Sequence, residues 1–93
     1  MKRQRDTKYL RWVASLPCIA CGTMECQAHH VRMGHGGGLS RKPDDRYAIP
    51  LCFHDHDDLH RHGERRFFEA RGIDPLVAAA KIYARYQAQR GAA

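Results

Sequence analysis

Long hydrophobic runs are missing from this sequence. The longest unbroken apolar run covers only residues 76–80, whereas a membrane-spanning helix needs about 20 consecutive apolar residues. The first dozen residues are basic and no apolar stretch follows them, so they do not resemble a secretory signal peptide. We therefore expect no membrane contact and a cytoplasmic location.

The sequence also lacks the length for a large core. With 93 residues it has room for one small domain, which we place at residues 1–93. Its 43% of hydrophobic residues exclude a disordered tail, but a domain of this size buries little apolar surface and needs a disulfide or a metal. Thiols stay reduced in the cytosol, so the four cysteines are expected to serve metal binding rather than disulfide formation.

Charges of the two signs are unevenly distributed. Residues 1–12 hold five bases and one acid, and residues 61–93 hold seven bases and three acids, so each flank has a net charge of +4. Residues 13–60 have a net charge of −2 and contain all four cysteines and six of the seven histidines. This pattern fits a metal-holding centre approached by a polyanion, whose phosphates the flanks would contact. Basic flanks that are merely solvated are the alternative.

Hydrophobic periodicity and cap residues predict a mixture of helices and strands. Helices are expected over residues 7–16, 55–62, 64–70 and 74–90. Strands are expected over residues 28–31 and 47–53, with an irregular glycine-rich loop over 34–45 between them. Pro50 restricts the second strand to an edge or a bulge.

Three cysteines have the spacing of a structural zinc site. Cys18 and Cys21 form a C-x-x-C zinc knuckle, and Gly22 permits the tight turn behind them. Cys52 follows the second expected strand, so a hairpin would bring it to the same ion.

The fourth zinc ligand has three candidates. The third position after Cys52 is usually Cys or His, but here it is Asp55. A carboxylate can bind zinc. His54 and Cys26 compete for the same role.

A second cluster of potential ligands consists of histidines. His56 and His60 are four residues apart in an expected helix, so both imidazoles project from one face and can reach one cation. His29 and His30 are adjacent in an expected strand, where alternation directs one ring toward the helix and the other elsewhere. One of the pair would bind the metal and the other would act on a water molecule.

Such a centre is suited to phosphodiester hydrolysis. A divalent cation with open positions can bind a phosphate oxygen and the leaving oxygen, and a neutral imidazole can take a proton from the attacking water. Four arginines are near enough in sequence to bind phosphate, although each is equally explained as a solvated surface residue. They are Arg32, Arg61, Arg65 and Arg66.

Five sequence elements together resemble the HNH endonuclease family, most closely its phage members of the recombination enhancement function type. The resemblance covers about residues 12–72. In order, the elements are Cys18-x-x-Cys21, Ala-His29-His30-Val-Arg, a glycine-rich loop, Ile-Pro-Leu-Cys52 and His56-x-x-x-His60.

The resemblance implies an α+β fold with a small ββα-metal (His-Me finger) core and a zinc knuckle, flanked by N-terminal and C-terminal helices. It implies that His29, His56 and His60 bind one catalytic divalent cation (Mg, Mn or Zn) and that His30 is the general base. It also implies a separate structural zinc held by Cys18, Cys21 and Cys52, with Asp55 in place of the usual fourth ligand.

One further position departs from the family pattern. The middle Asn of the family falls on Tyr47, so the hydrogen bonds that brace the loop must come from another residue, for which Asp44 and Asp45 are candidates.

The expected function is hydrolysis of DNA phosphodiester bonds by a phage or prophage enzyme in the cytoplasm of a bacterial host cell. DNA is the expected partner, and a recombination or packaging protein is left open as a second one. The competing interpretation is a zinc-stabilised nucleic-acid-binding module without catalytic activity.

Overall fold

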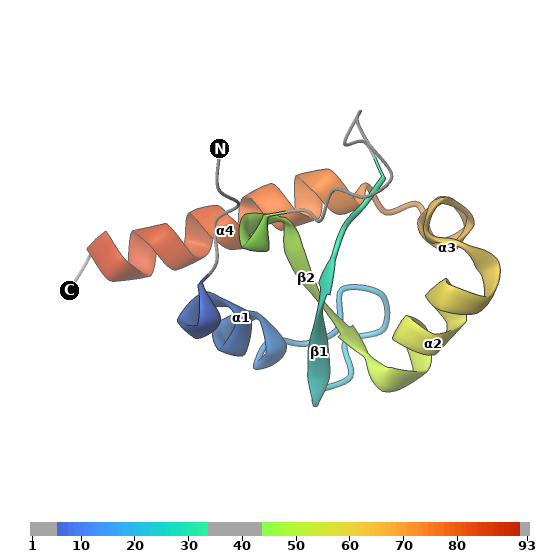
Figure 1. Ribbon diagram of the computed structural model, residues 1–93, viewed down its shortest axis with the longest axis horizontal. Helices are drawn as coiled ribbons and strands as arrows, with labels where there is room; N and C mark the ends of the chain where they lie inside the picture. The colour runs from blue at the N-terminus through green and yellow to red at the C-terminus, as the bar shows by residue number, and fades with distance from the viewer. Residues whose placement is uncertain (1–5, 34–43, 92–93) are drawn as a thin grey trace.

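An antiparallel β-hairpin lies at the centre of the fold, with helices on either side of it (Figure 1). The computed structural model describes residues 6–33 and 44–91. The elements in these ranges are α1 (Thr7–Ala14), β1 (Cys26–His30), the 3-10 turn η1 (Asp45–Tyr47), β2 (Ala48–Cys52), α2 (Phe53–His62), α3 (Glu64–Arg71) and α4 (Pro75–Gly91). The described part of the chain is therefore a small α+β fold with four α-helices and a two-stranded sheet, as expected for the fold class.

The hairpin register runs from the pair Cys26 and Cys52 to the pair His30 and Ala48. The first strand begins two residues earlier than the sequence predicts, and the second is shorter at both ends. Pairing across the hairpin, rather than local propensity, sets these limits. The strand β2 can contain Pro50 because both strands of a two-stranded sheet are edge strands.

Side-chain caps determine where α1 and α2 begin. The Asp6 carboxylate accepts the Tyr9 N–H at 3.1 Å, which starts α1. The Cys52 sulfur accepts the Asp55 N–H at 3.5 Å, so α2 begins at Phe53 rather than at residue 55. At its other end α1 stops at Ala14, short of the predicted residue 16, because the Ser15 N–H already closes the last turn.

Glycines and a proline separate the later helices. Gly63 (φ 92°) ends α2, and Gly72 (φ 65°) ends α3 in the left-handed region that favours glycine. Asp74 then accepts the N–H groups of Leu76 and Val77 at 3.1 and 3.2 Å and starts α4. Both later helices match the sequence prediction to within a residue.

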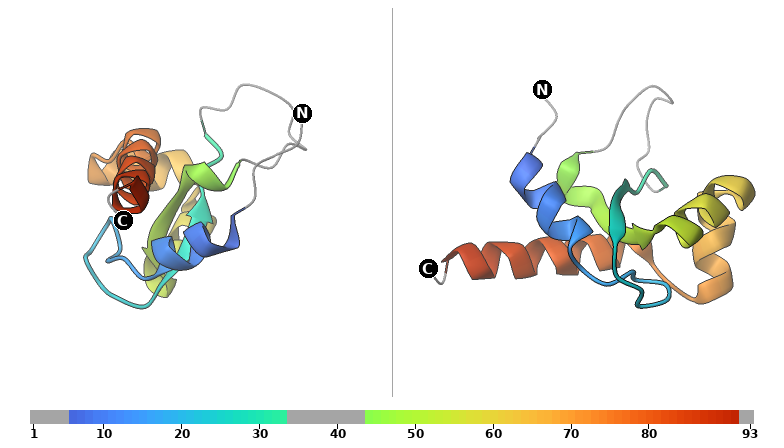
Figure 2. Two further views of the ribbon diagram at one scale, coloured as in Figure 1. Left: turned by 90° about the vertical axis from the view of Figure 1, so that its left-hand side faces the viewer. Right: turned by 90° about the horizontal axis from the view of Figure 1, so that it is seen from below.

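The core forms where α1 and α4 pack against the hairpin. Helix α1 contacts both strands, and α4 contacts β2 and η1, so every residue of β2 is buried. Helices α2 and α3 lie on the other side of β1 from α1 (Figure 2). The largest fully buried side chains are Tyr9, Phe67, Phe68, Ile49, Leu51, Val13, Val31 and Pro50.

Some residues to which the sequence analysis assigns a loop or a basic flank lie outside the part of the chain that the structure describes. Residues 34–43 of the predicted glycine-rich loop lie outside the described residues, as do the basic residues before residue 6. The sequence predicts that the loop reaches residue 45, but Asp45 begins the 3-10 turn η1. Among the helices of the described ranges, none has the length and hydropathy that a bilayer span requires.

Candidate metal centres

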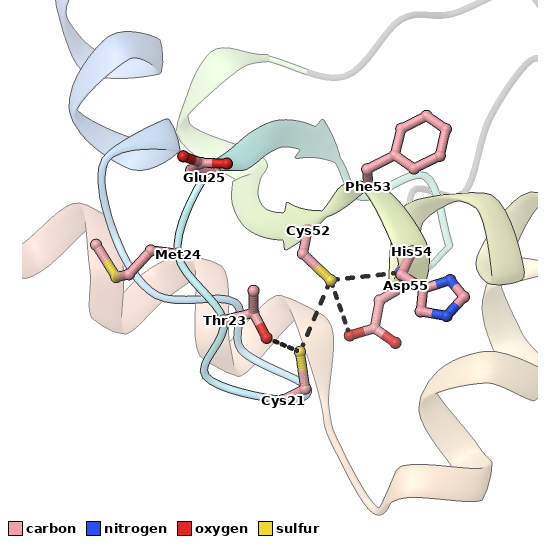
Figure 3. Close-up of a pocket in the computed structure, with 8 residues that line it drawn as sticks. All are labelled: Cys21, Thr23, Met24, Glu25, Cys52, Phe53, His54 and Asp55. Carbon is pink, nitrogen blue, oxygen red and sulfur yellow. Dashed lines mark hydrogen bonds between the residues drawn. The ribbon is translucent and has the colours of Figure 1, made fainter.

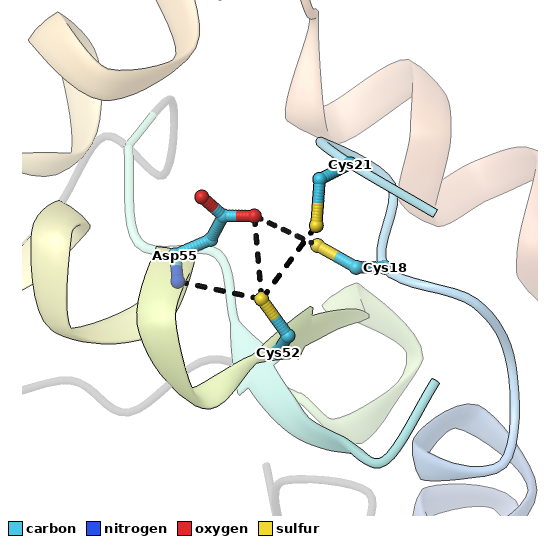
Figure 4. A group of neighbouring side chains, drawn as sticks. All are labelled: Cys18, Cys21, Cys52 and Asp55. Carbon is cyan, nitrogen blue, oxygen red and sulfur yellow. Dashed lines mark hydrogen bonds between the residues drawn. The ribbon is translucent and has the colours of Figure 1, made fainter. Parts of the chain in front are cut away.

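The first group of potential ligands joins the cysteine-rich turn to the hairpin and to α2 (Figure 4). It consists of Cys18, Cys21, Cys52 and Asp55, and one ligand atom from each lies within 4.8 Å of the others. Cys18 and Cys21 occupy the turn before β1, Cys52 ends β2, and Asp55 lies in the first turn of α2. The hairpin therefore brings the knuckle to Cys52, as the sequence predicts.

The distances in this group fit a tetrahedral zinc site. Two sulfurs bound to one zinc ion at 2.3 Å lie roughly 3.8 Å apart, and the sulfurs of Cys21 and Cys52 are 3.7 Å apart. Asp55 Oδ2 lies 3.3 Å from Cys18 Sγ and 3.4 Å from Cys52 Sγ. Three sulfurs and one oxygen could thus hold a metal ion.

Of the three candidates for the fourth position, only Asp55 belongs to the group whose ligand atoms all lie within 4.8 Å of one another. The Cys26 thiol instead donates to the Thr23 carbonyl at 3.2 Å, and His54 is exposed on α2. Arg71, which the sequence analysis does not single out, lies 3.9 Å from the second oxygen of Asp55. The same guanidinium nitrogen donates a hydrogen bond to Asp58 Oδ2 at 3.1 Å.

Burial and hydrogen bonds shift the pKa values of this group in opposite directions. Burial raises the pKa of the Cys52 thiol to about 12, so a bound cation must displace the thiol proton. Burial also acts to raise the pKa of Asp55, but hydrogen bonds from the three thiols and the charge of Arg71 outweigh it and lower the pKa.

The second group consists of His29 on β1 with His56 and His60 on α2, which we call the histidine trio. His56 Nε2 lies 3.2 Å from both His29 Nδ1 and His60 Nε2. Two nitrogens bound tetrahedrally to one zinc ion at 2.0–2.1 Å would be about 3.3 Å apart. His29 is 6% exposed whereas His60 is exposed, so a cation held here would have one side open to solvent.

Hydrogen bonds outside the trio determine which ring nitrogens carry protons. The His56 Nδ1–H donates to Gln27 Oε1 at 2.6 Å, because an amide oxygen can only accept. The His29 Nε2–H donates to Glu64 Oε2 at 2.7 Å. When both rings are neutral, His29 Nδ1 and His56 Nε2 therefore face each other as lone pairs. They repel each other unless a metal ion or a shared proton lies between them.

The same surroundings favour a neutral His56 ring and a charged Glu64 carboxylate. Burial, with the neighbouring rings of His29 and His60, lowers the pKa of His56, and neutral imidazole is the form that binds metals. Burial acts to raise the pKa of Glu64, but hydrogen bonds from His29 and from the backbone of Met33 and Arg32 outweigh it, and the pKa is lowered.

His30 lies apart from the histidine trio and pairs with a different carboxylate. Its Nε2 is 2.8 Å from Asp45 Oδ1, and Asp45 is 2% exposed and also accepts the backbone N–H of Asp6. The strand alternation expected for His29 and His30 is present, because only His29 contacts α2. Asp45 is one of the two residues that the sequence offers as candidates for bracing the loop.

The four predicted phosphate-binding arginines are exposed. Two of them form ion pairs along their own helices, Arg61 with Asp57 at 3.1 Å and Arg65 with Glu69 at 4.0 Å. Within the described residues the other two, Arg32 and Arg66, take part in no ion pair. The structure does not gather the four around the histidine trio.

Comparison with known proteins places the chain in a family. A family model described as a protein of unknown function, DUF968, matches residues 1–86. The chain belongs to the DUF968 family. It is also similar to the uncharacterized protein YdfU of Escherichia coli (strain K12), with 44% identity over 62 residues. These cover 63% of this chain and 18% of YdfU, so the chain spans less than a fifth of that relative. No solved structure matches it.

In this DUF968 chain, a surface pocket of about 420 Å³ adjoins the first ligand group (Figure 3). Cys21 and Cys52 line it together with Met24 and Phe53, which are 53% and 73% exposed. The Phe53 ring points away from the Cys52 sulfur. Of the two cysteines that line the pocket, Cys21 is exposed, whereas Cys52 is 6% exposed.

Three residues that contact the ligands, Gln27, Glu64 and Arg71, are not among the residues predicted from the sequence. Gln27 lies two residues before His29 on the same face of β1, a spacing that could have identified it. Glu64 and Arg71 are separated from their partners by 35 and 16 residues, and no sequence pattern links them.

Proposed function

We propose that this chain is a metal-dependent endonuclease of the HNH type that hydrolyses DNA phosphodiester bonds. The observation that carries the proposal is the histidine trio, in which hydrogen bonds to Gln27 and Glu64 direct the lone pairs of His29 and His56 toward each other. Histidines that bind metals usually donate their other ring N–H to an oxygen acceptor, which directs the remaining lone pair at the metal ion.

The order of elements supports the same proposal. An antiparallel hairpin followed directly by a helix carries the trio, with His29 on β1 and the other two rings on α2. This is the arrangement expected of a ββα-metal core. The ligand group at Cys18, Cys21, Cys52 and Asp55 would hold the structural zinc beside it.

Different residues of the chain would bind the cation, accept the proton and bind the phosphates. The trio would hold a divalent cation, which as a Lewis acid would offset charge on the phosphate and on the leaving oxygen. The Asp45 carboxylate accepts the Nε2–H of His30, which leaves Nδ1 free to take a proton from the attacking water. The side chains of Arg32 and Arg66 are exposed and form no ion pair in the described ranges, so their guanidinium groups are available to phosphates.

A plasmid-cleavage assay tests the proposal. Purified protein is incubated with supercoiled plasmid and Mg²⁺, Mn²⁺ or Zn²⁺, with a chelator control. We expect nicking that requires the cation, that falls about 100-fold or more in His30→Ala, and that is also lost in His56→Ala. His62→Ala is the matched control, because His62 lies on α2 but pairs with Asp58 outside the trio.

Two results would contradict the proposal. Cleavage by His30→Ala at the wild-type rate would show that His30 is not the general base. Metal-dependent DNA binding without any cleavage would instead favour the zinc-stabilised binding module.

A further inference from the structure

Glu64 makes four hydrogen-bond contacts from the first residue of α3. Its Oε1 accepts the backbone N–H groups of Arg32 at 3.0 Å and Met33 at 2.6 Å. Its Oε2 lies 2.7 Å from His29 Nε2 and 3.1 Å from the Arg32 nitrogen. Both oxygens are therefore engaged by groups that follow or belong to β1.

These contacts fix the ring of His29 in two ways. Backbone N–H groups can only donate, so both oxygens of the Glu64 carboxylate act as acceptors. His29 Nε2, which contacts one of these oxygens, must then carry the ring proton. The 2.7 Å contact also holds the orientation of the His29 ring. The His29 side chain is 7% exposed, so the ring has little room to rotate. Nδ1 is left as the lone pair that faces His56.

The backbone around Glu64 brings the carboxylate to this place. Gly63 precedes it with φ 92°, a conformation that side chains rarely adopt, and the chain reverses there from α2 into α3. Glu64 thus connects the helix that carries His56 and His60 to the strand that carries His29.

We infer that Glu64 is a positioning residue for the cation site, a carboxylate that holds His29 in the tautomer and orientation that bind a divalent metal. The inference rests on the proposed metal centre and adds to it a residue outside the ligand set. Carboxylate partners of metal-binding histidines typically change metal affinity by about 10–100-fold when they are removed.

Co²⁺ titration of zinc-loaded protein tests this, with Glu64→Ala and Glu64→Gln compared with wild type. We expect Co²⁺ affinity at the histidine trio to fall about 10–100-fold in Glu64→Ala, with a changed visible absorption spectrum. Glu69→Ala is the matched control, since Glu69 lies on the same helix and contacts only Arg65 among the ion pairs described. If Glu64→Ala does not fold, Glu64→Gln provides the comparison, because it retains an oxygen acceptor but has no charge.

The protonation state of the His29 ring gives a second readout that does not need metal. Nitrogen NMR of the metal-free protein should show His29 with its proton on Nε2, and a mixture of tautomers in Glu64→Ala. A folded Glu64→Ala protein with wild-type Co²⁺ affinity or with an unchanged His29 tautomer would overturn the inference, as would a Glu64→Gln protein with wild-type Co²⁺ affinity. Wild-type protein that binds no Co²⁺ would instead overturn the metal centre of the proposed function.

Discussion

At the residue scale, Tyr9 is a large side chain whose hydroxyl is buried without compensation. The side chain is 1% exposed, and its oxygen has no hydrogen-bond partner in the part of the chain that the structure describes. The ring itself packs against Trp12, Tyr83 and Tyr86 at centroid distances of 6.0, 5.3 and 4.9 Å. The ring therefore stabilises the contact of α1 with α4, whereas the hydroxyl does not.

We predict that Tyr9→Phe retains or raises the melting temperature at neutral pH. A buried polar group without a partner costs about 1–3 kcal/mol, and phenylalanine removes that cost while keeping the ring. Tyr9→Ala, the comparison variant, should lose about 3–5 kcal/mol of unfolding free energy. A Tyr9→Phe protein as destabilised as Tyr9→Ala would contradict this account.

The same residue predicts a loss of stability in alkali. Burial, together with the neighbouring Tyr83 and Tyr86, raises the pKa of Tyr9 from 10.0 to about 12. The folded state thus favours the neutral phenol. Its contribution to the free energy of unfolding is fully present below pH 10 and is lost as the pH rises toward 12. Melting temperatures measured between pH 9 and 12 should fall more steeply for wild type than for Tyr9→Phe.

At the scale of elements, the cysteine-rich turn has little regular structure of its own to hold it. Two backbone hydrogen bonds close the turn, one from the Cys18 N–H to the Thr23 carbonyl at 2.9 Å and one from the Gly22 N–H to the Cys18 carbonyl at 2.8 Å. Glu25 has φ 65°, an unfavourable value for a residue other than glycine. A bound metal would compensate for this cost.

We predict that Cys18→Ser loses zinc and unfolds or melts at a much lower temperature than wild type. Zinc binding in such sites contributes directly to folding free energy. Cys26→Ser is the matched control, because its sulfur bonds to the Thr23 carbonyl and lies outside the ligand group. Metal analysis and thermal melting measure both effects; a Cys18→Ser protein with unchanged zinc content and melting would rule out the thiolate site.

The sequence predicts the elements better than their contacts. Caps and glycines identify α3 and α4 because those signals are local, and the His29 and His30 alternation follows from strand geometry alone. The start of β1 at Cys26 depends on its pairing with Cys52, and the Glu64 contact depends on how α3 folds back on β1. Both involve residues distant in sequence, so local patterns do not reveal them.

At the scale of the whole molecule, one helix serves both candidate metal centres. Asp55 belongs to the sulfur-containing group and His56, the next residue, belongs to the histidine trio. A cation at the first centre would fix the first turn of α2, and this same turn sets the position of His56. The two centres should therefore be coupled.

We predict that Asp55→Ala weakens Mn²⁺ binding at the histidine trio by about 10-fold, within the range known for residues that support metal ligands. Mn²⁺ is a suitable probe because it prefers nitrogen and oxygen ligands to thiolates. Asp57→Ala is the control, since Asp57 lies on α2 but pairs with Arg61 at the surface. Equal Mn²⁺ affinity in wild type and a folded Asp55→Ala protein would show that the centres are independent.

The proline in β2 has a consequence for assembly. Pro50 has no N–H group to offer, and its carbonyl already accepts the Ile19 N–H at 3.1 Å. An incoming strand from another molecule would find neither a donor nor a free acceptor at the middle of this edge. The β2 edge of the hairpin is thus protected from edge-to-edge aggregation, a hazard for any sheet that ends in an unpaired strand.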